Sequence, residues 1–479
     1  GAGGMVETSG AKVWITGDVR ASSERGKAGE WLIDPGDIEV KTRLAGDPLQ
    51  GNSMADVQKV TETLNNGTSV NIQTDNLTGL NDNSITITDA IRKTSGGDVA
   101  LRLKATGAIN INADITSETP ASAATPTGKL SLEVTSDTNK TAGGSVSVAS
   151  GTSIKTLGGS VKIGGGLVDN GVGFANSQSA GEAGITLNGV TIDTRVDPAG
   201  APGTAGGSVE MAGSTTADAA GVLLAGSTIQ TGTGKVTLIG KSTGSNPAVA
   251  KGIKIDGGSS ITTRTVELRT DTIDLAGQIT GDNDPAGYAK VWTLSDGRAI
   301  NFGTGTGGLD LAGNTFSGSG KITNFYKNIV GDASQKANIT VGGVTSDSDL
   351  ELNTGAGTMA VSGTVDVAAG HALTLASKGQ VAGTGKITTD ALRLDAADAE
   401  VSLTGANAVK NVDGKAKKLT LKNSGNLAVG AETGLVTGAG GADIDVAGDL
   451  TVGGTTPLAG GAAALKNGAG ALKLKASGT

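Results

Sequence analysis

The chain has 479 residues and a formal net charge of −8, and it contains 80 glycines, no cysteine and only 2% aromatic residues. Without cysteine there are no disulfides and no thiolate metal sites, no stretch is apolar enough for a transmembrane helix, and the first residues do not resemble a signal peptide. The mild negative charge without a basic block argues against nucleic acid as a partner.

Short strands with alternating apolar residues follow one another along the chain. The clearest are residues 99–103, 109–113, 130–134, 146–148, 350–352, 365–367, 373–375 and 419–421. A period of two is typical of a strand with one buried face. Gly, Asn and Asp separate the runs, as turns require, and we find no helical period of ten residues or more. The chain is therefore predicted to be all-β, with an interior of Val, Ile, Leu and Ala.

The strands belong to a repeat. A strand that begins with glycine occurs at 159–163, 207–211 and 234–238. A second strand follows at 184–187, 221–224 and 252–255, and a third at 190–194, 227–231 and 260–263. Self-similarity of this size predicts a solenoid, here a parallel β-helix with three strands in each coil. The competing antiparallel sandwich would need regular hairpin turns and larger core residues.

The repeats differ in the loops between the first and second strands, at 164–183, 212–220 and 240–251. Because coils stack, we expect these loops to protrude from the same side. Residues 282–330 hold six of the nine aromatic residues and are predicted to form an irregular coil or excursion. The predicted organisation is a β-helix with variable corner loops over 1–281, this aromatic-rich segment over 282–330, and a continuing shaft over 331–479. Neither end has a polar cap, so we expect a fragment of a longer shaft.

The N-terminal part carries two motifs, Gly-Met-Val-Glu-Thr-Ser-Gly at 4–10 and Gly-Glu-Trp-Leu-Ile-Asp-Pro at 29–35. They resemble the signature of two-partner-secreted exoproteins of the filamentous haemagglutinin and high-molecular-weight adhesin family. The likeness continues through 64–70 and 93–98, then through the glycine-rich repeats to about residue 281. The resemblance implies a right-handed β-helix, export through an outer-membrane partner transporter, and display on the cell surface. The family's Asn-Pro-Asn-Leu-type secretion motif and an Arg-Gly-Asp tripeptide are absent from the sequence, so no binding specificity is carried over.

Four asparagines, Asn66, Asn76, Asn139 and Asn338, begin N-x-[ST] sequons. The resemblance implies that such residues carry sugars, whereas a chain rich in Asn, Thr and Ser also produces sequons by chance. Tyr288 and Trp292 are candidates for a sugar-stacking platform; the alternative is that they fill the local core.

Enzymatic signals are weak. His371 is the only histidine, so no histidine-based triad or zinc site is expected, and we interpret it as a turn residue. A polysaccharide-cleaving β-helix would need clustered carboxylates. The candidate pairs are Asp34 with Asp37, Asp282 with Asp284, and Asp395 with Asp398, and each is also explained by turn chemistry.

A Gly-x-Gly-x-x-Gly pattern at 303–308 precedes a strand-like segment rather than the helix that would hold phosphate. We therefore expect no catalytic residue, no metal site and no cofactor.

These observations predict a secreted surface adhesin fragment that attaches to a host-cell glycan or an extracellular polysaccharide. A biofilm-matrix or cell-aggregation protein is the alternative, and a polysaccharide-cleaving enzyme is a third possibility.

Overall fold

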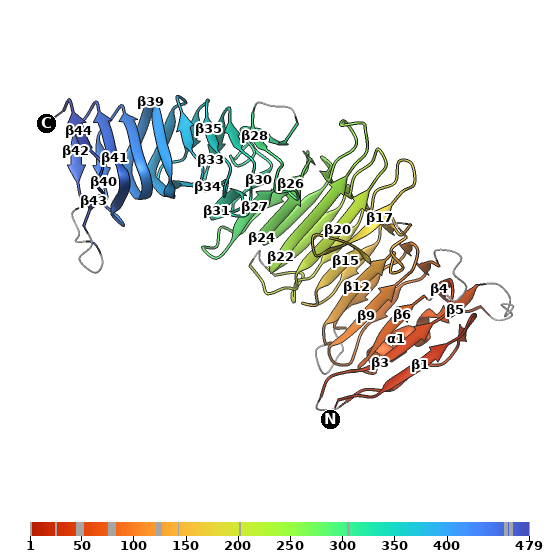
Figure 1. The fold of residues 1–479 in the computed structure, drawn as a ribbon. Helices are drawn as coiled ribbons and strands as arrows, with labels where there is room; N and C mark the ends of the chain where they lie inside the picture. Colours follow the sequence, from red (N-terminus) through yellow and green to blue (C-terminus); the bar gives the residue numbers. More distant parts are fainter. Residues whose placement is uncertain are drawn as a thin grey trace. The chain divides into compact units, whose positions relative to one another are not determined.

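The fold is a parallel β-helix, which confirms the predicted fold class. The computed structural model describes residues 2–478 except 24–25, 45–51, 75–82, 121–126, 142, 201–202, 304–306, 455–457 and 459–462. The chain forms two compact units, which we call unit 1 (residues 1–267 and 274–279) and unit 2 (residues 268–273 and 280–479). Within each unit, successive coils stack so that strands pair in parallel (Figure 1). The predicted domain boundaries at 281 and 330 remain a prediction.

Unit 1 contains short strands with alternating burial. In chain order they are β1 (Met5–Ser9), β2 (Trp14–Ile15), β3 (Gly29–Asp34), β4 (Ile38–Lys41), β5 (Ser53–Asp56), β6 (Thr68–Gln73), β7 (Ile85–Ile87), β8 (Ile91–Lys93), β9 (Val99–Lys104), β10 (Ile109–Ile111), β11 (Ile115–Ser117), β12 (Leu130–Ser136), β13 (Val146–Val148), β14 (Ser153–Lys155), β15 (Val161–Gly165), β16 (Leu167–Asp169), β17 (Val172–Ser177), β18 (Ile185–Asn188), β19 (Thr191–Asp193), β20 (Val209–Thr215), β21 (Val222–Ala225), β22 (Thr228–Ser242), β23 (Ile253–Ile255), β24 (Ser260–Thr270), β25 (Ile273–Leu275) and β26 (Gln278–Thr280).

The core of unit 1 consists of three columns of like aliphatic residues, one for each row of strands. The first row aligns Leu101, Leu132, Val161, Val209 and Val236. The second aligns Ile85, Ile109, Val146, Ile185, Val222 and Ile253. The third aligns Ile91, Ile115, Ile154, Ile192 and Ile229. All of these side chains are buried. The register reproduces the predicted repeat, because β-branched residues pack well on a pleated surface.

Two elements of unit 1 depart from the prediction. The α-helix α1 (Val57–Asn65) interrupts the all-β pattern; it begins after Asp56, whose side chain accepts a hydrogen bond from the Gln58 N–H. The strands β16 and β17 form an antiparallel hairpin within an otherwise parallel structure. Apart from this hairpin, the registered strand pairs of the described residues are parallel, which excludes the antiparallel sandwich.

Unit 2 continues the same design with strands of similar length. In chain order they are β27 (Tyr288–Trp292), β28 (Ile300–Phe302), β29 (Leu309–Leu311), β30 (Ile322–Thr323), β31 (Lys327–Gly331), β32 (Ile339–Val341), β33 (Val344–Ser346), β34 (Asp349–Asn353), β35 (Met359–Val361), β36 (Val365–Val367), β37 (Ala372–Ala376), β38 (Val381–Gly383), β39 (Ile387–Asn423), β40 (Leu427–Val429), β41 (Leu435–Val446), β42 (Leu450–Val452), β43 (Leu465–Asn467) and β44 (Leu472–Ala476).

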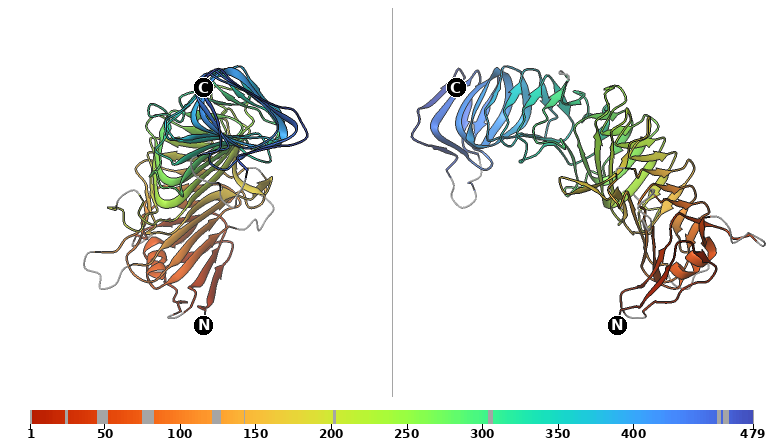
Figure 2. Two further views of the ribbon diagram at one scale, coloured as in Figure 1. Left: turned by 90° about the vertical axis from the view of Figure 1, so that its left-hand side faces the viewer. Right: turned by 45° about the vertical axis from the view of Figure 1, so that its right-hand side comes forward.

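Three aliphatic columns also fill unit 2, whose coils appear in side view in Figure 2. They align Leu350 with Leu373 and Leu392, Met359 with Val381 and Val401, and Val344 with Val365 and Ile387. The long strand β39 runs around more than one coil, so different parts of it belong to different rows.

Charged residues of unit 2 alternate in sign from one coil to the next. Residues 390–400 contribute Asp390, Asp395, Asp398 and Glu400, and residues 410–422 contribute Lys410, Lys415, Lys417, Lys418 and Lys422. Residues 432–449 contribute Glu432, Asp443, Asp445 and Asp449, and residues 466–475 contribute Lys466, Lys473 and Lys475. Ion pairs cross these coils from Lys410 to Asp390 (2.6 Å) and from Lys475 to Asp445 (3.3 Å). Each stack therefore places opposite charges over one another.

Candidate functional site

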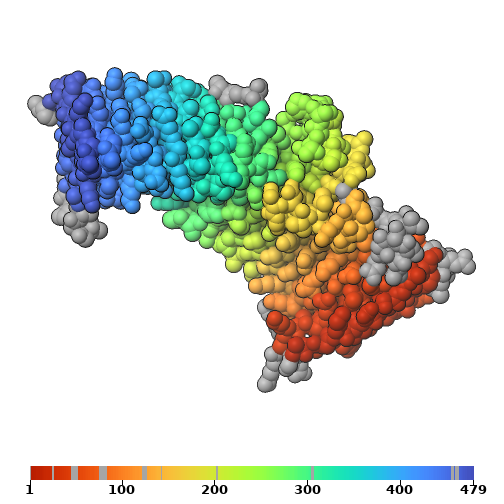
Figure 3. Space-filling view, viewed as in Figure 1, coloured from red at the N-terminus to blue at the C-terminus, as the bar shows by residue number. Residues whose placement is uncertain are grey.

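Three excursions lie between the first and second rows of unit 1. They are the β16–β17 hairpin, residues 216–220 after β20, and residues 243–251 after β22; together we call them the corner cluster. The predicted loop bounds were too wide, because residues 212–215 and 240–242 extend β20 and β22, and β17 itself pairs with β20. In the space-filling view, the yellow and light-green segments protrude along one edge of unit 1 (Figure 3).

Side-chain contacts hold the corner cluster together. The Lys241 Nζ lies 2.6 Å from Asp169 Oδ2 of the hairpin. The Asp218 carboxylate accepts a hydrogen bond from the Asn246 N–H at 2.8 Å, and the Thr215 hydroxyl donates to the Glu182 carbonyl at 3.2 Å. As expected from stacking, the three excursions lie side by side.

The hairpin has the backbone of a tight turn. Asn170 and Gly171 both have positive φ, at 49° and 78°, as the favoured two-residue hairpin turn requires. Phe174 is buried and fixes the base of the hairpin, whereas Val168 is 61% exposed. With Val249, which is 39% exposed, Val168 gives the corner cluster an accessible apolar component among polar groups.

The predicted aromatic pair lies on the outer face of β27. Ala289 and Val291 are fully buried, while Tyr288, Lys290 and Trp292 alternate with them and are half-buried. Tyr288 and Trp292 therefore do not fill the local core, which makes the core-filling interpretation wrong. Their role in binding remains a prediction.

Lys290 occupies one face of Trp292. Its Nζ lies 4.5 Å from the centre of the Trp292 ring and 2.5 Å from Asp332 Oδ2. Burial alone would raise the pKa of Asp332, but hydrogen bonds from Lys290 and Ser334 outweigh it and lower that pKa to about 2. A sugar ring could therefore stack only on the opposite face of Trp292.

The sequon asparagines have different environments. Asn66 closes helix α1, and Thr68 of its sequon is buried and accepts the Ala21 N–H. The Asn338 carbonyl oxygen accepts the Thr358 N–H at 3.0 Å. Asn76 lies outside the described residues.

In the third described sequon, the Asn139 side-chain oxygen accepts the Thr141 hydroxyl at 3.1 Å. Asn139 thus lies in a surface turn, and of the three described sequons it is the one least tied to neighbouring coils. Modification of any of them remains a prediction.

The candidate carboxylates serve mainly as turn caps. Asp37 accepts the Ser84 N–H at 2.6 Å, and Asp282 accepts the Asp284 N–H at 3.1 Å. Asp395 and Asp398 are exposed and line a cavity of about 140 Å³ together with Lys378 and Asn353. This cavity is smaller than the roughly 300–1,000 Å³ typical of ligand pockets.

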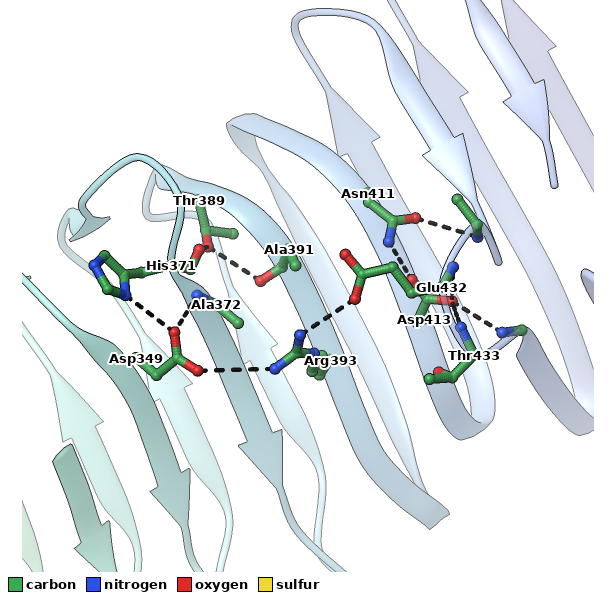
Figure 4. A network of polar contacts seen from close by, with 12 residues as sticks. Asp349, His371, Ala372, Thr389, Ala391, Arg393, Asn411, Asp413, Glu432 and Thr433 are labelled. Atoms are coloured by element: carbon green, nitrogen blue, oxygen red, sulfur yellow. Dashed lines mark hydrogen bonds and ion pairs between the residues drawn. The ribbon is translucent and has the colours of Figure 1, made fainter. Parts of the chain in front are cut away.

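His371 begins a polar network on the outer face of unit 2 (Figure 4). Its Nδ1 lies 3.2 Å from Asp349 Oδ1. Arg393 bridges the next coils, at 3.8 Å from Asp349 and 3.2 Å from Glu432. His371 directly precedes β37, in agreement with its interpretation as a turn residue.

The same network contains a buried carboxylate. Asp413 Oδ1 accepts the consecutive N–H groups of Glu432, Thr433 and Gly434 at 2.8–3.1 Å. Three converging N–H groups form an anion-binding concavity, and here an aspartate of the preceding coil fills it. The network therefore joins coils.

A wider groove of about 420 Å³ crosses the last coils of unit 2. Its floor consists of small residues such as Gly405 and Ala447, and Lys422, Asp445 and Lys475 border it. These three residues are consecutive in register, so the alternation of charge between coils accounts for their arrangement.

Sequence reasoning identified the corner loops but not the contacts that hold them. The Asn170-Gly171 dipeptide between apolar residues is a hairpin signal and would have placed β16 and β17. The Lys241–Asp169 and Asp218–Asn246 contacts join different coils, and no local pattern marks them.

Among the described residues, no three His, Cys, Asp or Glu side chains gather as a metal site would require, and no helix there is long and apolar enough to span a membrane. No known protein-family model matches the chain, and no curated protein matches it. The described geometry, rather than a relative, must therefore carry any functional conclusion.

Proposed function

We propose that this chain is a β-helical segment of a secreted bacterial surface adhesin, and that the corner cluster of unit 1 contacts a cell-surface or extracellular glycan. The observation that carries the proposal is the bracing of three excursions from successive coils on one side of the stack. Loops with high sequence variety on a regular scaffold are the usual place for binding residues.

The stack itself supports a mechanical role. In the described columns, Val, Ile and Leu repeat in register and backbone hydrogen bonds run from coil to coil, so the fold needs no disulfide. Such a scaffold holds loops in fixed positions, and weak contacts that recur on one side add up through multivalency.

The chemistry of the corner cluster supports a glycan rather than a compact protein partner. Polar groups such as Asp218, Lys241 and Asn246 surround the exposed side chains of Val168 and Val249. Sugars present hydroxyl groups together with apolar C–H faces, so this mixture is complementary to them. Strand β27, with Tyr288 and Trp292, is a second candidate contact surface.

Export through an outer-membrane partner transporter and display at the cell surface belong to the same proposal, because they follow from the resemblance in the N-terminal motifs. Co-expression with and without a partner transporter, followed by surface biotinylation, tests this part. Display that does not depend on the transporter would contradict it.

The binding proposal is tested by measuring the purified chain on a glycan array and on host cells. The variants Val168→Asp and Val249→Asp place a charge on the corner cluster. The matched control is Val452→Asp in unit 2, whose side chain is 48% exposed. We expect the first two variants to weaken binding by roughly fivefold or more, with the control unchanged.

Other outcomes would redirect the assignment. Equal loss of binding in all three variants, or no loss in any, contradicts a role for the corner cluster. Loss only on Trp292→Ala transfers the contact to β27. Concentration-dependent aggregation without glycan binding supports the biofilm alternative, and release of reducing or unsaturated sugars supports an enzyme.

A further inference from the structure

Lys93 is buried where the strand pattern calls for an apolar side chain. In β8 the inward positions are Ile91 and Lys93, and Lys93 is 0% exposed. Lysine is almost never fully buried without a partner, and an unsatisfied buried charge is very costly. The site must therefore supply strong compensation for the ammonium group.

Three backbone carbonyl groups supply it. The Lys93 Nζ donates to the carbonyl oxygens of Ser95 at 2.8 Å, Gly96 at 3.1 Å and Gly128 at 3.1 Å. An ammonium group has three N–H donors and no acceptor, so the number of donors equals the number of oxygens. Gly96 and Gly128 lie in successive coils, joined by the Gly128 N–H to Gly96 carbonyl hydrogen bond at 2.8 Å.

The following coils use a hydroxyl at the same place. Lys93 is in register with Ser117, and the row continues through Thr156, Thr194 and Thr231. These hydroxyls donate to corner carbonyls of Gly128, Gly159, Gly207 and Gly234 at 2.5–3.0 Å. A hydroxyl has a single donor, whereas the corner at Lys93 presents three oxygens to one group.

We propose that the carbonyl oxygens of Ser95, Gly96 and Gly128 form a site for a primary ammonium group, which Lys93 fills as a tethered ligand that fastens two successive coils. The ligand class follows from the geometry, because three hydrogen-bond acceptors and no carboxylate surround the nitrogen. A quaternary ammonium ion has no N–H donor and does not satisfy the site.

The protonation state agrees with this assignment. Burial lowers the pKa of Lys93 to about 8, and the negative charge of Asp98 acts in the opposite direction. The group is therefore still an ammonium at neutral pH and can satisfy all three oxygens.

Chemical rescue tests the site. Lys93→Ala removes the tethered ligand, and Lys129→Ala, at an exposed lysine of the neighbouring corner, is the matched control. Hydrogen exchange of the Gly128 amide reports the joint between the coils. We expect Lys93→Ala to accelerate that exchange by roughly 10- to 100-fold, the loss of a charged hydrogen bond, and Lys129→Ala to leave it unchanged.

Addition of ethylammonium chloride should restore slow exchange in Lys93→Ala, whereas tetramethylammonium or sodium chloride at equal ionic strength should not. Restoration by all three salts, or by none, overturns the ammonium site. If Lys93→Ala does not fold, acylation of the intact chain decides: Lys93 should resist an amine-selective reagent that modifies Lys129. Equal reactivity of the two lysines overturns the proposal.

Discussion

The two units use the same aliphatic columns but differ in how much chain they place at the corners. In unit 1, Val161 pairs with Val209, 48 residues later, and Val209 pairs with Val236, 27 residues later. In unit 2 the corresponding separations are 23 residues for Leu350 to Leu373 and 19 for Leu373 to Leu392. The core therefore tolerates excursions of very different length, because they leave the stacked columns intact. Candidate binding elements can vary in unit 1 while unit 2 stays nearly uniform.

Core truncation gives the largest expected effect and tests whether the units unfold separately. Leu132→Ala in unit 1 and Leu373→Ala in unit 2 each remove a buried column residue and should cost about 2–5 kcal/mol. Each should accelerate hydrogen exchange in its own unit only. Equal acceleration in both units from either variant would show a single cooperative structure.

Lys93 gives unit 1 a stability that depends on alkaline pH. Its pKa is about 8 in the fold and 10.5 as the ordinary value, so the folded state disfavours the proton. The stability penalty is fully present below pH 8 and disappears as pH rises to 10.5. Relative to Lys93→Met, the unmodified chain should gain roughly 3 kcal/mol over that range.

This gain is measured by urea unfolding of both proteins between pH 7 and pH 11. A stability difference that stays flat over that range would contradict the low pKa.

Asp332 gives unit 2 the opposite dependence. Its pKa is lowered from 3.8 to about 2, so its contribution is present above pH 3.8 and is lost as pH falls towards 2. Because the carboxylate is partly exposed, we expect only about 1 kcal/mol after screening by solvent. Asp332→Asn should lower stability at pH 6 and flatten the acid limb of the unfolding curve; an unchanged acid limb would contradict this role.

Charge reversal in the outer columns should have the smallest effect. Arg102 lies 2.6 Å from Glu30 in unit 1, and Arg393 lies 3.2 Å from Glu432 in unit 2. Arg102→Glu and Arg393→Glu should each cost about 1 kcal/mol or less, and high salt should reduce the loss. A loss that salt does not change would point to packing of the arginine stems instead.

Much of the fold could be predicted because its signals are local. The alternation in 99–103 and 130–134, and the repeat from 159 to 263, reported strands and their register directly. Helix α1 was missed because its nine residues include Val57, Val60, Thr61 and Thr63, whose β-branched side chains favour strands. Its cap at Asp56 was the available signal.

The sites were harder to predict because their contacts join coils. The inward position of Lys93 follows from the alternation in β8, yet lysine is normally an outward residue, so only the carbonyls of another coil explain it. In the same way, the sequence marks Tyr288 and Trp292 as unusual but does not show that Lys290 covers one ring.

The coil-by-coil change of sign in unit 2 has a consequence for assembly. Coils of nearly equal length with similar aliphatic interiors are easily confused during folding, since a coil docked one place too far would still find matching apolar partners. Such a slip would set Lys410 and Lys422 above Lys473 and Lys475, where like charges repel. The alternation thus works as a parity check on coil order, and a variant with all-lysine outer columns should misassemble even though its interior is unchanged.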